Sequence, residues 1–329
     1  MRLYFAPLEG ITDGIYRSAH SRFFGGVDKY FTPFLSPSAG FRITKREKRS
    51  LMYDASDAYM CVPQLLTKDS QVFAESAKAL CGAGFEEVNL NLGCPSGTVT
   101  AKGKGSAMLS DPDALDSFFS EVFTASGMPR ISVKTRICFE SADSWPAIWK
   151  VLSQYPFCEI IVHPRARKEF YRGRTHPEAL MLCTGSQTDV IYNGDIFSPA
   201  DYSCILKELP FLKGVMLGRG LVANPVLADD IRTGEKITKE RLRQFHDFLW
   251  TAYCSEMPFK AAHGRILEIM SYMSQCLEGS RKQLKRMRKA KGPGEYLCCA
   301  EALFETCKLR NEPYFDPLFL SSGNSTPVI

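Results

Sequence analysis

The chain has 329 residues, of which 45% are hydrophobic and 23% are charged. This composition excludes a mostly disordered protein, and no apolar run reaches the roughly 18 residues that a membrane-spanning helix needs, so we expect no membrane partner. The twelve cysteines are scattered along the chain, and no basic region followed by an apolar one marks the N-terminus, so we expect a cytoplasmic protein with reduced thiols.

Short β-rich apolar runs alternate with helical segments over residues 1–236. Some of these runs, such as 159–163 and 214–217, are continuous, which is typical of parallel strands buried on both faces. A doubly wound sheet is the alternative, but it commonly has about five or six strands and a glycine-rich first turn, which is absent here. We therefore predict an α/β fold, a (β/α)8 or TIM barrel. The strands are expected at 3–8, 29–35, 60–66, 87–92, 130–136, 159–165, 189–192 and 214–217.

The sequence changes character after residue 236. Apolar residues recur at helical spacing in 241–257 and 261–276, and a basic stretch at 281–291 precedes a last helix near 295–309. Because no β-rich run interrupts these segments, we predict a smaller all-α domain over 237–316. Residues 317–329 are expected to form a flexible tail.

Positive charge is concentrated in this second domain. Between Lys236 and Lys291 there are 13 Lys and Arg against 5 Asp and Glu, a net charge of +8, whereas the whole chain carries +5. A local excess of this kind is expected where a protein binds a polyanion, although a solvated helical face would give the same pattern.

Polar side chains follow most of the predicted strands at their C-terminal ends. In a (β/α)8 barrel these ends meet at one mouth, and that mouth carries the active site. A purely structural role would explain an isolated polar residue there, but not a polar residue after seven of eight strands. The residues concerned are Glu9, Gln64, Asn91, Cys94, Lys134, Arg136, His163, Arg165, Asn193, Asp195 and Arg219.

Cys94 is the strongest single candidate for catalysis. It follows a predicted buried strand, and Gly93 and Pro95 hold it on a stiff turn. A buried cysteine is often inert, but here a glycine- and lysine-rich segment comes next, at 98–106. That segment suits a mobile flap that closes over the site and contacts phosphates through residues such as Lys102.

The segments after the last two strands predict a phosphate site. They read Asn193-Gly194-Asp195 and Gly218-Arg219-Gly220, and (β/α)8 barrels commonly bind phosphate at these two loops. No Gly-x-Gly-x-x-Gly follows the first strand, which leaves a Rossmann-type dinucleotide site unsupported, and no cysteine or histidine spacing indicates a metal.

A flat aromatic cofactor with one phosphate, such as FMN, fits this mouth better. Its ring would lie on the apolar shelf of Ala6, Pro7 and Leu8 and would hydrogen-bond to Gln64 and Lys134. The predicted cofactor site comprises Ala6, Pro7, Leu8, Glu9, Gln64, Lys134, His163, Asn193, Gly194, Asp195, Gly218 and Arg219.

Six motifs in this order resemble the tRNA-dihydrouridine synthases over essentially the whole chain. Two positions depart from the family pattern, with Asn89 where Asp is common and Pro164 where Gly is common. Neither departure removes a catalytic group. The motifs are 6–13, 91–109, 133–136, 163–165 with 171–173, 193–196 and 218–225.

The resemblance implies the reaction. The family reduces the C5–C6 double bond of a tRNA uridine, here expected in the D-loop, with NADPH as reductant acting through FMN. Hydride passes from flavin N5 to C6, and the cysteine that corresponds to Cys94 donates a proton to C5. The expected protein is a monomer whose substrate contacts include Asn91, Lys102, Arg136, Arg165, Arg286, Arg288 and Lys289.

Two other functions stay open at this point. An FMN-dependent (β/α)8 reductase of a free pyrimidine or enone would have the same mouth, but it would have no use for the basic helical domain. A non-catalytic RNA-binding protein would have the basic domain, but it would have no need of Cys94 and the cofactor residues. Flavin colour in the purified protein separates the second alternative from the first.

Overall fold

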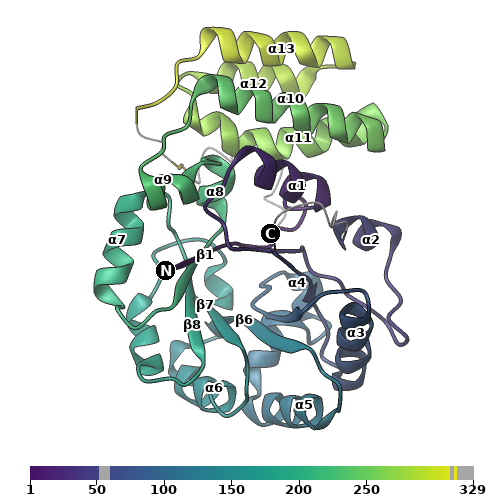
Figure 1. Ribbon diagram of the computed structural model, residues 1–329, viewed down its shortest axis with the longest axis vertical. Helices are drawn as coiled ribbons and strands as arrows, with labels where there is room; N and C mark the ends of the chain where they lie inside the picture. Colours follow the sequence, from purple (N-terminus) through teal and green to yellow (C-terminus); the bar gives the residue numbers. More distant parts are fainter. Residues whose placement is uncertain (52–59, 312–314, 317–329) are drawn as a thin grey trace.

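The computed structural model describes residues 1–51, 60–311 and 315–316. Within them, nine parallel strands form one sheet in the order β3-β2-β1-β9-β8-β7-β6-β5-β4, with helices outside it (Figure 1). The strands are β1 (Arg2–Phe5), β2 (Lys29–Phe31), β3 (Met60–Val62), β4 (Gln64–Leu65), β5 (Glu87–Leu92), β6 (Arg130–Cys138), β7 (Glu159–Ala166), β8 (Asp189–Asn193) and β9 (Gly214–Leu217).

The two outer members of that order, β3 and β4, are pieces of one run interrupted at Pro63. β3 pairs with β2, β4 pairs with β5, and the Pro63 carbonyl accepts a hydrogen bond from the Asn89 backbone N–H at 2.9 Å. Proline has no N–H to donate, so the run is split there without leaving the sheet. The sheet therefore closes into an eight-stranded parallel barrel, which confirms the predicted fold class.

The strand bounds differ from the prediction in a regular way. β5 and β9 have the predicted bounds, whereas β1 and β2 end before Pro7 and Pro33, which cannot donate to the ladder. β6 and β7 continue past the predicted ends to Cys138 and Ala166, with a shift of register between them. These two extensions carry the polar ends of β6 and β7 toward the barrel mouth.

Helices cover the outside of the barrel, and several begin at side-chain caps. Asp13, Asp69 and Asp111 each accept a hydrogen bond from a backbone N–H in the first turn. After β7 a 3-10 helix, η4, stands where an α-helix was expected. The helices are α1 (Gly14–Phe23), α2 (Lys45–Leu51), α3 (Ser70–Gly82), α4 (Gly97–Thr100), α5 (Pro112–Thr124), α6 (Trp145–Leu152), η4 (Pro177–Cys183), α7 (Pro199–Glu208), α8 (Arg219–Ala223) and α9 (Leu227–Thr233).

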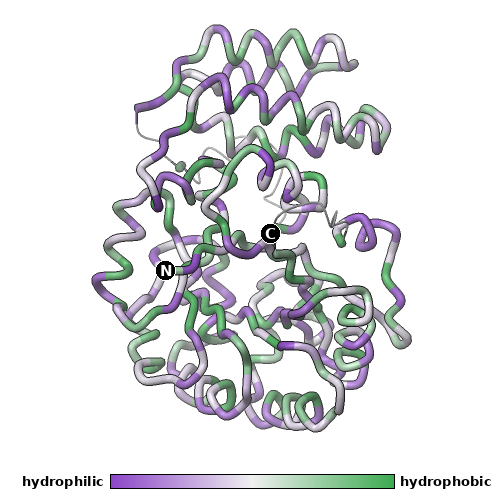
Figure 2. The backbone as a smooth tube through the Cα atoms, in the orientation of Figure 1, coloured by the Kyte–Doolittle hydropathy of each residue, from purple (hydrophilic) through white to green (hydrophobic). Residues whose placement is uncertain are grey.

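Four further helices stand above the barrel in Figure 1. They are α10 (Lys239–Glu256), α11 (Phe259–Met273), α12 (Ser280–Lys289) and α13 (Pro293–Thr306), and hydrophilic and hydrophobic residues alternate along them (Figure 2). Phe245 of α10 packs edge-on against Tyr16, His20 and Phe24 of the barrel. One apolar core thus continues from the barrel into these helices. The boundary at residues 236 and 237 stays a prediction, and the predicted tail at 317–329 lies outside the described residues.

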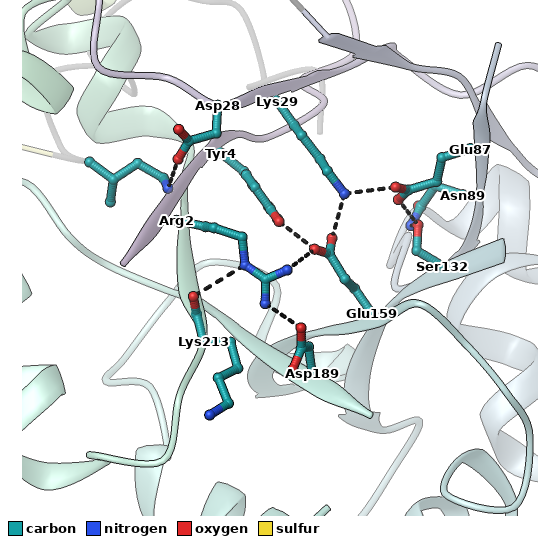
Figure 3. Close-up of polar contacts among 11 residues, drawn as sticks. Arg2, Tyr4, Asp28, Lys29, Glu87, Asn89, Ser132, Glu159, Asp189 and Lys213 are labelled. Atoms are coloured by element: carbon teal, nitrogen blue, oxygen red, sulfur yellow. Dashed lines mark hydrogen bonds and ion pairs between the residues drawn. The ribbon is translucent and has the colours of Figure 1, made fainter. Parts of the chain in front are cut away.

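The N-terminal end of the barrel is closed by a network of charged and polar side chains (Figure 3). The ammonium group of Lys29 donates to Glu87 at 2.7 Å and to Glu159 at 3.0 Å. Glu159 also accepts hydrogen bonds from Tyr4 and Arg2. Both carboxylates are buried, so this ion-paired floor leaves neither of them without a partner.

Within the described part of the chain, no helix combines the length and apolar character needed to cross a bilayer.

Candidate active site

A cavity of about 640 Å³ opens at the C-terminal ends of the barrel strands. All twelve residues predicted to hold a cofactor line it, from the segment after β1 to Arg219 at the start of α8, together with Asn91 and Cys94. Tyr272 of α11 closes one side, so the helices above the barrel contribute to the wall. Residues far apart in the chain meet here because every strand of the barrel points the same way.

Cys94 lies at the wall of this cavity and is 8% exposed. Its backbone N–H donates to the Asn91 side-chain oxygen at 2.9 Å, and the Gly93 N–H donates to the same oxygen at 3.0 Å. This tight turn fixes where the thiol points. Burial raises the pKa of Cys94 above its ordinary value, so the sulfur keeps its proton at neutral pH.

The segment after Cys94 is folded rather than an open flap. It forms α4 and a 3-10 helix, η1 (Gly105–Ser110), and the Ser106 hydroxyl donates to the Cys94 carbonyl at 2.8 Å. Gly105 has φ +62°, and a Cβ there would lie 3.1 Å from the Cys94 side chain. Glycine therefore lets the segment pack directly on the cysteine turn.

A chain of hydrogen bonds connects this turn to the barrel interior. The Asn91 amide donates to the Gln64 oxygen at 2.8 Å, and the Gln64 amide donates to Asn89 at 2.7 Å. Asn89 then donates to Ser132, whose hydroxyl donates to Glu87 of the floor. Asn89, one of the two departures from the family pattern, can both donate and accept in this chain, whereas an ionised Asp could only accept.

Basic side chains gather at one side of the cavity, and burial shifts the pKa of two of them toward the neutral form. Burial, and next the neighbouring Arg136, lowers the pKa of Lys134 to about 7. Burial and four nearby cations hold the pKa of His163 well below its ordinary value, so this imidazole is neutral. Lys134 makes no hydrogen bond or ion pair with any residue that the structure describes, and its side chain lines the cavity.

Asp195 is the main counter-charge at this side. Its carboxylate pairs with Arg165 and with Arg219, and these hydrogen bonds and charges lower its pKa despite burial. The Arg219 guanidinium lies 4.9 Å from the Tyr171 ring centre and 5.6 Å from that of Phe197. Two cations sharing one carboxylate leave a net positive charge beside the glycine segments that follow β8 and β9.

Arg136 and Arg165, two of the predicted substrate contacts, are placed behind the lining of the cavity. Both are fully buried, and neither lines the cavity. Arg136 donates to the carbonyls of Gly93, Ala166 and Phe170, whereas Arg165 donates to Asp195 and Gly173. Buried guanidinium groups need several acceptors, and both arginines find them in the loops. Direct substrate contact by Arg136 and Arg165 stays a prediction.

Apart from Asn91, which lines the cavity, the remaining predicted substrate contacts lie outside it. Lys102 is exposed after α4, and Arg286, Arg288 and Lys289 are in the last turn of α12, where Arg286 and Lys289 are exposed. Four aromatic side chains of the wall were missed: Phe34, Phe170, Phe197 and Tyr272. Phe34 was missed because the predicted strand 29–35 runs past the observed end of β2 at Phe31 and because only polar strand-end residues were considered. Nothing in the sequence places Tyr272 here.

Comparisons with known proteins identify the family of this chain. The family model described as dihydrouridine synthase (Dus) matches residues 4–301. The tRNA-dihydrouridine(16) synthase of Pseudomonas syringae pv. tomato is 26% identical over 306 residues, which cover 88% of this chain and 95% of that protein. The tRNA-dihydrouridine(16) synthase of Pseudomonas putida is 28% identical over 290 residues, which cover 84% of this chain and 88% of that protein.

Two further similarities are weaker. A probable tRNA-dihydrouridine synthase of Staphylococcus aureus strain Mu50 is 28% identical over 244 residues, 72% of this chain and 73% of that protein. A solved structure of TcOYE with pHBA is 10% identical, covers 73% of this chain and 91% of that chain, and has a TM-score of 0.50. At that identity the structural likeness shows the barrel fold alone.

Proposed function

We propose that this chain, which belongs to the dihydrouridine synthase family, reduces the C5–C6 double bond of a tRNA uridine, with FMN as cofactor and NADPH as reductant. The observation that supports this most is that the Cys94 thiol lines the same cavity as Arg219 and as the Lys134 amine, which has no partner among the described residues. The names of the two Pseudomonas relatives include position 16, which makes that uridine of the D-loop the first to examine.

The residues of the cavity fit FMN. Lys134 lacks a protein partner within the described residues, so its amine is free to donate to a polar edge of the ring. Ala6, Pro7 and Leu8 form an apolar wall for the flat face. The volume of about 640 Å³ lies within the range of sites for molecules of cofactor size.

The far side of the cavity suits a phosphate. Asn193, Gly194, Gly218 and Arg219 line it together. A Cβ at Gly194 would lie 2.7 Å from the Tyr192 hydroxyl, so only glycine fits at this point of the wall. Arg219 supplies the charge, and its pairing with Asp195 holds the guanidinium in place.

FMN, when bound, supplies the hydride that amino-acid side chains cannot supply. Cys94 holds the second reagent, a proton on Sγ, and the Asn91 side chain fixes the turn that carries it. The high pKa of Cys94 suits a general acid rather than a nucleophile. Neutral His163 accepts a hydrogen bond from Arg165 at Nε2, which leaves its Nδ1–H to donate to an uncharged base.

A direct assay tests the proposal. Purified protein is incubated with FMN, NADPH and an unmodified tRNA transcript, and dihydrouridine is measured by mass spectrometry. Dihydrouridine that requires all three additions supports the proposal. Reduction of free uridine or an enone at the same rate as tRNA favours the small-molecule reductase, and FMN binding without any product favours neither enzyme.

A further inference from the structure

A second cluster of positive charge lies at residues 42–49, and the net charge of the chain outside 236–291 does not reveal it. Residues 42–49 contain five Lys and Arg and only one acid, Glu47, but the chain outside 236–291 is net negative. α2 lies in this segment and buries none of its side chains. Its basic residues therefore face solvent rather than pack against the barrel.

The loops around α2 bring further lysines to the same place. The Lys104 ammonium donates to the Ser36 hydroxyl at 3.0 Å, and the Ser36 N–H donates to Glu47 of α2 at 2.7 Å. Lys68 lies against the Lys104 loop, since a Cβ at Gly103 would be 3.2 Å from the Lys68 amine. We call the set the rim patch: Arg42, Lys45, Lys48, Lys68, Lys102 and Lys104.

The charge of the rim patch is not neutralised. In the described part of the chain no member of it forms an ion pair, and both Glu47 carboxylate oxygens accept backbone N–H groups, from Ser36 and Thr44. Burial, and next the charges of Lys102 and Lys68, lowers the pKa of Lys104. Like charges held this close are expected where an anionic partner binds.

The rim patch borders the cavity. Pro33 and Phe34 line the cavity and lead into Ser36, and Glu9, another lining residue, pairs with Arg46 of α2. The basic helix α12 belongs to another part of the molecule, because it packs against α11 and α13 (Figure 1). A chain whose base enters the cavity therefore meets separate cationic surfaces on the barrel rim and on the helical region.

We propose that the rim patch binds the phosphate backbone of RNA next to the nucleotide whose base enters the cavity. The proposal rests on the proposed function, which brings a polyanion to this mouth. A membrane surface is the other polyanion, but α2 reads KREKRSL and offers one apolar residue, too little for a helix that inserts into lipid.

A triple variant tests the proposal. R42A/K45A/K48A removes three exposed charges without touching a cavity residue, and K150A/K207A/K213A removes three exposed charges near the opposite end of the barrel. The Kd for tRNA is measured between roughly 50 and 200 mM salt. Each lost phosphate contact lowers the slope of log Kd against log salt by about 0.7–0.9, so we expect a decrease of about 2 and unchanged FMN binding.

The outcomes separate this proposal from the proposed function. The control variant and the charge-preserving R42K/K45R/K48R variant should bind tRNA as the wild type does. An unchanged slope in R42A/K45A/K48A, while the wild type still forms dihydrouridine, overturns the rim patch alone. Loss of phosphatidylserine-vesicle binding with tRNA binding intact also overturns it. Absence of dihydrouridine in the wild-type assay overturns the proposed function, whatever the slopes show.

Discussion

The two ends of the barrel differ in how their charged side chains are paired. At the floor, Lys29 lies between Glu87 and Glu159, and every charged group of the network has an opposite partner (Figure 3). At the mouth, Asp195 alone pairs with two arginines, and Lys134 has no partner among the described residues. The charged groups of the floor are therefore paired within the protein. At the mouth, Lys134 is left to hydrogen-bond to a ligand.

The largest expected effect at the mouth comes from Cys94→Ala. Removing the proton donor should lower turnover by about 10²- to 10⁴-fold, the usual contribution of a general acid, with FMN still bound. Product formation and flavin absorbance measure the two effects. Cys138→Ala is the control, because that thiol is buried but does not line the cavity. Normal multiple turnover by Cys94→Ala would remove the acid role.

The dependence of turnover on pH is a second test of Cys94 as the proton donor. Since burial raises the pKa of Cys94, the thiol is a competent acid at neutral pH and loses its proton only as the pH rises through that raised pKa. Turnover should therefore fall on the alkaline side, and the residual turnover of Cys94→Ala should lack this decrease. A rate that rises with pH in the wild type would indicate a thiolate instead.

A substitution in the ion-paired floor should lower the free energy of unfolding rather than change the reaction at the mouth. Lys29→Met leaves two buried carboxylates without their shared cation, which costs about 3–5 kcal/mol in the free energy of unfolding. Urea denaturation measures this cost. Arg174→Ala breaks an exposed pair with Glu178 and should leave the midpoint unchanged. A Lys29→Met protein as stable as the wild type would show that the network contributes nothing.

Lys134 should make FMN binding depend on pH. Its pKa is about 7 in the free site because of burial, and a bound acceptor favours the charged amine, so binding takes up a proton. The Kd for FMN should rise by up to about tenfold per pH unit between pH 7 and 9. Titrations followed by flavin fluorescence test this, and Lys134→Met should bind weakly at every pH. A wild-type Kd constant over this range would contradict the assignment.

The smallest effect is expected from the basic helix of the upper region. Neutralising Arg286, Arg288 and Lys289 together should weaken tRNA binding and lower its salt slope by about 2, without changing flavin content. Equilibrium binding at several salt concentrations measures this. An unchanged slope would mean that this face of α12 is only solvated.

The sequence predicts the barrel mouth better than its surroundings. Gln64, Lys134 and Asn193 could be placed in one cavity because parallel strands of a barrel point the same way and end at one mouth. The direction in which a long side chain points could not be predicted from the sequence. Arg136 and Arg165 point away from the cavity and donate hydrogen bonds to backbone carbonyls.

Charge was equally hard to place from the sequence. A count over a long stretch found the basic helix α12 but missed the segment 42–49 around α2, because acids elsewhere in the barrel offset its five cations. Similarly, the contribution of Tyr272 depends on how α11 packs against the barrel, which no local pattern encodes. The spacing of residues along the chain predicts helices and strands, but it does not predict which of these elements pack against each other.

The most direct test of the account compares RNA from cells that carry this protein with RNA from cells that lack it. Dihydrouridine is mapped by mass spectrometry in both, and in deletion cells that express either the wild type or Cys94→Ala. We expect one or more tRNA positions to lose dihydrouridine in the deletion and to regain it with the wild type alone. Identical dihydrouridine maps with and without the protein would contradict it.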